Sequence, residues 1–139
     1  MADPRIFDFI RRRIGEGIYS RLATYDDAVN YIGPGKRGAL KILRYTCGCD
    51  LNPAGWLHDC GYEFGGGEKE KEFWDDLFLA AMLKLIELHQ FPFGTAWLLR
   101  RAARFRAIEY YNEVRECGDA FFIKRDKPLV ALPLDSLAA

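Results

Sequence analysis

Four polar side chains in the middle of the chain have the types and spacing that acid–base chemistry needs. His58 and Asp59 are adjacent, and Tyr62 follows His58 by four residues, which is about one helical turn. Asp75 lies farther along, in a run that is otherwise rich in apolar residues. A carboxylate that holds an imidazole in one tautomer leaves the second ring nitrogen able to take a proton, which is the general-base arrangement. The sequence therefore indicates a histidine base with an aspartate partner.

Asp75 is expected to lie on the buried face of its helix. At about 100° per residue, four apolar side chains fall within about 60° of this carboxylate: Phe78, Leu79, Met82 and Ile86. A buried charge without a partner is costly, so Asp75 needs a cationic or hydrogen-bonding neighbour.

Two predicted helices position these side chains. An Asn-Pro start signature predicts a helix over about 53–64, and after three glycines a second helix is predicted over about 68–90. A connection this short makes the helices antiparallel, and at about 1.5 Å per residue His58 and Asp75 each lie about 10 Å from the turn. The two side chains can therefore meet, and Tyr62 can donate its hydroxyl to the same carboxylate.

Other signals predict the rest of a small, mostly α-helical single domain over residues 1–139. The additional elements are a first helix that starts at Asp3–Pro4 and stops at Gly15 and Gly17, a short helix capped by Thr24 through Tyr31, a helix from Thr95 to about Cys117, and an extended tail.

The composition narrows the class of protein. Half of the residues are hydrophobic and the formal net charge is zero, which is typical of a globular protein and gives no argument for nucleic-acid binding. No apolar run reaches the roughly 20 residues that span a bilayer, and the first residues lack the pattern of a signal peptide. We therefore expect a soluble chain, cytoplasmic by default or delivered elsewhere, with its four cysteines as free thiols.

The residues alone leave the role of this polar group open. In one interpretation, the buried His58–Asp75 pair activates water. In the other, its hydrogen bond only rigidifies the helix pair. Asp59 points about 100° away from His58 and is either a cation ligand or a solvated helix residue. Gly33 and Gly35 allow backbone carbonyls to turn inward and, with Asp59, to form an oxygen cage for calcium. The simpler interpretation is that Gly33 ends a helix.

A zinc site is a minor alternative. The possible ligands form a C-x-C…H-x-C pattern, namely Cys47, Cys49, His58 and Cys60. The spacing is poor, because only one residue separates the members of each pair. On one helix, moreover, His58 and Cys60 point about 200° apart.

Three motifs together resemble a known family. The stretches YIGPG (31–35), HDCGY (58–62) and EFWDDLF (72–78) are similar, in this order, to a Tyr-x-Gly-x-Gly loop, an HD-x-x-Y helix and the aspartate of its partner helix. These are motifs of the secreted phospholipase A2 superfamily, in the compact form of parvoviral capsid phospholipase domains and some bacterial relatives. The resemblance covers residues 31–82.

The resemblance implies calcium-dependent hydrolysis of the sn-2 type ester of glycerophospholipids at a membrane surface, by a peripheral enzyme that is delivered to its target or carried in a virion. His58 would activate water, and Asp75 would orient His58 with help from Tyr62. Calcium would be held by Asp59 and by three backbone carbonyls, those of Tyr31, Gly33 and Gly35. The Gly33 amide would help to stabilise the oxyanion.

Aromatic and basic residues allow a lipid-facing surface as well. Trp56, Trp74 and Trp97 form either a lipid-binding rim or part of the core, and the core is the interpretation that we favour. A group of arginines can attract anionic head groups, but we favour the interpretation that they pair with the acids near 68–76 or are simply solvated: Arg100, Arg101, Arg104 and Arg106. The alternative to an enzyme is a non-catalytic helical module for binding or assembly, in which His58 matters only for stability.

Overall fold

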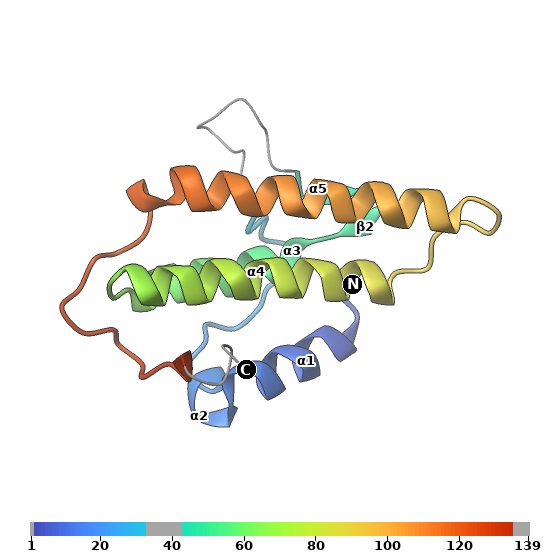
Figure 1. Cartoon of the computed structure of the whole chain (residues 1–139). Helices are drawn as coiled ribbons and strands as arrows, with labels where there is room; N and C mark the ends of the chain where they lie inside the picture. The colour runs from blue at the N-terminus through green and yellow to red at the C-terminus, as the bar shows by residue number, and fades with distance from the viewer. Residues whose placement is uncertain (1, 33–42, 135–139) are drawn as a thin grey trace.

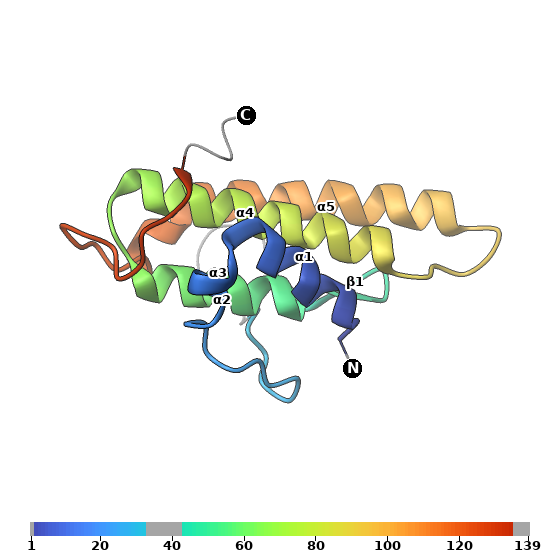
Figure 2. The ribbon, with the colours of Figure 1, turned by 90° about the horizontal axis from the view of Figure 1, so that it is seen from below.

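Helix α4 (Glu68–Leu88) lies at the centre of the molecule, and three other helices pack against it (Figures 1 and 2). The computed structural model describes residues 2–32 and 43–134. The other elements in these residues are α1 (Pro4–Ile14), α2 (Glu16–Tyr19), β1 (Tyr45–Thr46), β2 (Cys49–Asp50), α3 (Asn52–Phe64), α5 (Ala96–Cys117) and the 3-10 helix η1 (Gly118–Ala120). Their buried side chains form one hydrophobic core, which confirms the prediction of a small, mostly helical domain.

The antiparallel pair α3 and α4 forms through a close approach that only glycine allows (Figure 2). A Cβ atom on Gly61 would collide with the ring of Trp74, which is fully buried. At the end of α3, Gly65 has a φ of 68° and donates its N–H to the carbonyl of Gly61, 3.2 Å away. The chain therefore turns directly into α4. This helix begins at Glu68, as predicted, and ends at Leu88, two residues before the predicted Gln90.

The predicted helix from Thr24 to Tyr31 is wrong, because this segment forms turns. Its polar side chains bond to the backbone: Asp26 Oδ1 accepts from the Ala28 N–H, and Asn30 Oδ1 accepts from the Ile32 N–H. Such local bonds compete with the backbone bonds of a helix. A smaller correction concerns Gly17, which lies within α2 and does not end a helix, whereas Gly15 separates α1 from α2.

A short hairpin that the sequence interpretation did not predict precedes α3. Thr46 pairs with Cys49 in the antiparallel sheet, and the two residues between them have positive φ, 50° for Cys47 and 83° for Gly48. Two such residues form the tight turn that suits the twist of adjacent strands. The hairpin brings Asp50 beside the first turn of α3, where Asp50 Oδ1 accepts from the Asn52 N–H at 3.0 Å.

The segment after η1 crosses the α3–α4 turn. Ile123 N–H donates to the carbonyl of Tyr62, and Leu129 N–H donates to the carbonyl of Phe64. The ring of Phe122 packs edge-on against the ring of Tyr62, with centroids 5.2 Å apart. This largely extended segment therefore covers the end of α3 beside the predicted catalytic residues.

Candidate active site

His58 and Asp75 form the predicted pair across α3 and α4. His58 Nε2 lies 2.8 Å from Asp75 Oδ1, and the two residues are 8% and 0% exposed. The contact uses one ring nitrogen only, and within the described residues Nδ1 makes no hydrogen bond. The structure therefore brings together the two side chains that the sequence predicts at about the same distance from the turn.

Tyr62 donates to the same carboxylate oxygen as His58. Its hydroxyl lies 2.6 Å from Asp75 Oδ1, as the sequence predicts. The imidazole of His58 also packs between two rings, with centroid distances of 4.0 Å to Tyr62 and 4.7 Å to Phe78. These contacts limit rotation of the imidazole and hold Nε2 toward the carboxylate.

Two cations that sequence reasoning missed bind the other oxygen of Asp75. Lys71 Nζ donates to Asp75 Oδ2 at 2.8 Å, and Arg115 Nη1 donates to the same atom at 2.9 Å. Lys71 is almost fully buried, and its Nζ also donates to the carbonyl of Val114. Lys71 precedes Asp75 by one helical turn, which is a local signal. Arg115 comes from α5, and no local pattern indicated it.

Hydrogen-bond donors keep Asp75 charged, and burial keeps His58 neutral. Burial would raise the pKa of Asp75, but hydrogen bonds from His58, Lys71 and Tyr62 outweigh it and lower that pKa below its usual value. Burial also lowers the pKa of His58, against the opposing effect of Asp75. An ionised Asp75 only accepts hydrogen bonds, so the neutral His58 carries its proton on Nε2 and has its lone pair on Nδ1. This is the protonation state of a general base.

Asp59 lies on α3 next to His58 but takes no part in the buried cluster. Its side chain has no hydrogen bond or ion pair with any residue that the structure describes. Although the residue is exposed, the surrounding protein desolvates the carboxylate enough to raise its pKa to about 7, with the charge of Glu63 as a smaller cause. A carboxylate that lacks a compensating cation in this way fits a cation ligand.

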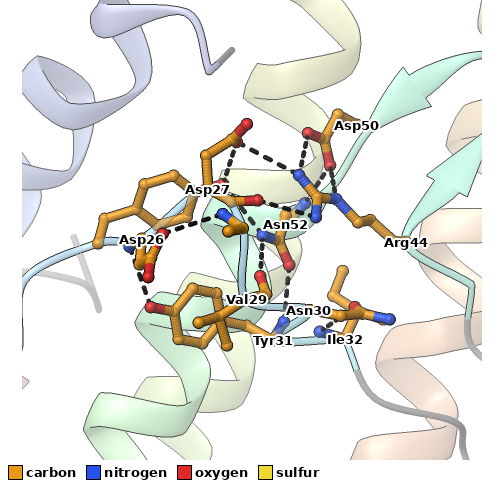
Figure 3. A network of polar contacts seen from close by, with 11 residues as sticks. Asp26, Asp27, Val29, Asn30, Tyr31, Ile32, Arg44, Asp50 and Asn52 are labelled. Atoms are coloured by element: carbon orange, nitrogen blue, oxygen red, sulfur yellow. Dashed lines mark hydrogen bonds and ion pairs between the residues drawn. The ribbon is translucent and has the colours of Figure 1, made fainter.

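The segment that leads to the predicted calcium loop is fastened to the first turn of α3. The buried side chain of Asn52 accepts from the Tyr31 N–H at 2.7 Å and donates to the Val29 carbonyl at 2.7 Å (Figure 3). A Cβ atom on Gly55 would lie only 3.1 Å from the Tyr31 carbonyl oxygen, so this carbonyl lies against α3. Gly55 is one turn before Asp59 on the same helix face. Gly33 and Gly35, the other predicted loop ligands, lie outside the described residues.

Arg44 adds a second attachment in the same region. Its guanidinium donates to Asp50 from Nε at 2.9 Å and to Asp27 from Nη2 at 3.3 Å (Figure 3). It therefore links the hairpin to the turns that precede Tyr31. The bonds of Asn52 and those of Arg44 therefore both restrain the backbone that leads to Tyr31.

The four possible zinc ligands do not form a site. His58 bonds to Asp75, Cys49 is buried in β2, and Cys47 is exposed in the hairpin turn. Within the described residues, which include all four, no three His, Cys, Asp or Glu side chains form a group that could hold a metal ion. Burial also raises the pKa of Cys49 to about 12, which disfavours the thiolate that zinc requires.

No family model, curated protein or solved structure matches the chain. Within the described residues, no helix has the length and apolar character needed to cross a membrane.

Proposed function

We propose that the protein is a calcium-dependent esterase that hydrolyses the sn-2 type ester of glycerophospholipids, as its motifs resemble those of phospholipase A2 enzymes. One observation carries the proposal: a neutral, buried His58 is held by Asp75 through Nε2, so that Nδ1 keeps a lone pair. A second feature supports it, because the Tyr31 carbonyl lies against the helix face that carries Asp59.

His58 acts as the base in this mechanism. Its Nδ1 takes a proton from a water molecule while the water oxygen attacks the carbonyl carbon of the ester. The tetrahedral intermediate then loses the glycerol oxygen, and Nδ1 returns the proton to that leaving group. The products are a fatty acid and a lysophospholipid, and His58 is neutral again.

Asp75 stabilises the imidazolium that forms during the reaction without taking its proton. Lys71 and Arg115 keep Asp75 ionised by bonding to Oδ2, while Oδ1 stays directed toward His58 and Tyr62. The carboxylate that positions the base is therefore itself held in place by Lys71 and Arg115.

Calcium would be held by the Asp59 carboxylate and by the Tyr31 carbonyl, together with the carbonyls of Gly33 and Gly35, as the resemblance implies. The fit is chemical: calcium prefers oxygen ligands, and the exposed Asp59 lacks a cationic partner within the described residues. When bound, calcium supplies positive charge that stabilises the oxyanion of the ester, and the Gly33 amide would donate to the same oxygen.

The test is fatty-acid release from mixed phospholipid vesicles, with millimolar calcium or with a chelator. We expect release with calcium only, and a decrease of about a thousandfold in His58→Asn, because general-base catalysis contributes rate factors of that order. His89→Asn is the matched control, since His89 is the second of the chain's two histidines and lies at the end of α4. No release by the folded wild-type protein under either condition would refute the proposal.

A second candidate is a non-catalytic helical module, and the Asp75 cluster is the observation that favours it. Four donors from three helices converge on one buried carboxylate: those of His58, Tyr62, Lys71 and Arg115. In this second candidate, the cluster has a structural role alone, which is to hold α3, α4 and α5 together. In that case His58→Asn changes the unfolding midpoint, and the wild-type protein releases no fatty acid.

A further inference from the structure

Helix α5 carries an exposed apolar stripe that the fold does not use. Trp97 and Phe105 are 67% and 66% exposed, and Leu98 and Ile108 are about half exposed. At about 100° per residue, all four lie within an arc of about 100° on the helix. The fully exposed Phe93 lies in the loop just before α5. This stripe corrects the sequence interpretation of Trp97 as a core residue, whereas Trp56 and Trp74 are buried as expected.

The stripe lies opposite the face by which α5 packs on α4. The residues of α5 that are buried are Ala103, Ala107 and Tyr110. Their mean direction is about 180° from that of the stripe. In Figure 1, α5 forms one side of the molecule, and α1 lies on the other side of α4. Packing among the described residues therefore leaves the apolar side chains of the stripe exposed.

Arginines outnumber acids along the stripe: Arg101 and Arg104 lie on it or beside it, and Glu109 lies beside its other edge. The segment from Ala96 to Ile108 has four arginines and no Asp or Glu. Arg101 and Arg104 fall within about 20° of the stripe's own arc. Both are exposed, and neither forms an ion pair with any residue that the structure describes. The predicted pairing of these two arginines with the acids near 68–76 is therefore not found, and this side of α5 is both apolar and positively charged.

We propose that this face of α5 docks on an anionic phospholipid surface, with the helix lying in the plane of the interface. Trp97, Phe105 and their apolar neighbours insert between head groups, while Arg101 and Arg104 reach the phosphates from the same arc. Arg101 and Arg104, against Glu109 at the edge of the stripe, give this face of α5 a net positive charge that is complementary to anionic lipid. Docking requires neither His58 nor hydrolysis, so it goes beyond the proposed catalytic function.

The test uses the full chain and vesicles of equal parts phosphatidylcholine and phosphatidylglycerol, in chelator so that calcium-dependent hydrolysis does not intervene. We expect the protein to sediment with these vesicles and to bind vesicles of pure phosphatidylcholine far more weakly. Trp97 is the exposed one among the three tryptophans, so docking should shift the tryptophan emission to the blue. In Trp97→Phe the protein should still bind, but the shift should disappear.

The variant Arg101→Gln/Arg104→Gln should bind the anionic vesicles about thirtyfold more weakly, because each arginine near such a surface contributes about a fivefold effect. Arg12→Gln/Arg13→Gln is the matched control, since it removes the same charge from exposed positions on α1. It should bind within about twofold of wild type.

Three results would overturn the proposal. The first is equal loss of binding in the α5 and α1 arginine variants, which would show an unspecific charge effect. The second is a concentration-dependent dimer in sedimentation velocity that Trp97→Ala/Phe105→Ala abolishes, since a second copy would then cover the stripe. The third is soluble polyglutamate that binds as tightly as the anionic vesicles, which would indicate an acidic protein partner.

Discussion

Arg115 donates from Nη1 to Oδ2 of Asp75 at 2.9 Å, although the two residues are 40 positions apart in the sequence. Its second terminal nitrogen donates to Glu68 at 3.1 Å, at the start of α4. Arg115 therefore ties the C-terminal end of α5 to the carboxylate that holds His58. The helix with the proposed docking stripe and the proposed catalytic base share one cluster of charged side chains.

Replacing Arg115 by Gln should lower the free energy of unfolding by about 1–2 kcal/mol, because it removes a hydrogen bond to a charged, fully buried acceptor. The measurement is the midpoint of urea unfolding. Arg106→Gln, at an exposed position on the same helix, serves as the control and should change the free energy by less than about 0.5 kcal/mol. Equal effects of the two substitutions would contradict the role of Arg115.

Replacing Lys71 by Met should cost about 3 kcal/mol at neutral pH, because it leaves a buried carboxylate with one cation fewer. The folded-state pKa of Asp75 is lowered, so its stabilising effect is present above the unfolded pKa of about 4 and is lost as pH falls through the folded value. The stability difference between wild type and Lys71→Met should therefore be constant above about pH 5 and shrink in acid. Unfolding titrations at several pH values measure it, and a difference that grows in acid would contradict the prediction.

Replacing Asp59 by Asn should stabilise the calcium-free protein at pH 8. Because the folded-state pKa of Asp59 is raised to about 7, protonation favours the fold, and that contribution is lost as pH rises through about 7. Since the side chain is exposed and screened by solvent, we expect a gain of about 1 kcal/mol. Calcium should raise the melting temperature of wild type but not of Asp59→Asn. A calcium-induced rise in both proteins would show that Asp59 is not a ligand.

The pH dependence of hydrolysis should reveal the titration of two side chains, those of His58 and Asp59. Burial lowers the pKa of His58 from its usual 6.5, so at saturating calcium the acidic limb of kcat should lie below pH 6.5. At limiting calcium, protons compete with the ion for Asp59, and the rate should already fall near pH 7. Initial rates of fatty-acid release across pH at both calcium concentrations provide the measurement. An acidic limb that stays above pH 6.5 at saturating calcium would argue against His58 as the base.

Replacing Asn52 by Ala should lower the free energy of unfolding by about 2–3 kcal/mol and weaken calcium binding as well. The fully buried amide bonds to Tyr25, Val29 and Tyr31, so its loss leaves polar groups unpaired and loosens the backbone at Tyr31. Asn112→Ala, at an exposed position of α5, is the control. Calorimetric calcium titration separates the two effects. Unchanged affinity in a destabilised Asn52→Ala would show that the Tyr31 carbonyl is not a ligand.

The helix pair and the central contact of the site follow from local patterns in the sequence. The spacing of apolar residues predicts that Asp75 lies on the buried face of its helix. The three glycines after Phe64 predict that the next helix runs antiparallel, which brings His58 and Tyr62 to the carboxylate. These inferences depend on periodicity and on a short connection, which are local properties of the chain. Lys71 also had a local signal, one turn before Asp75 on the same face, although sequence reasoning missed it.

The distant groups that complete the site depend on how the helices and loops pack together. Arg115 reaches Asp75 because α5 packs beside α4, and the residues from Thr24 to Tyr31 form turns partly because the Asn52 amide, 21 positions away, binds the backbone at Tyr31. Trp97 is exposed because α5 packs on α4 through its opposite face, which carries Ala103, Ala107 and Tyr110. Local patterns cannot give these outcomes, because the competing hydrogen bonds and packing surfaces exist only after the helices have assembled.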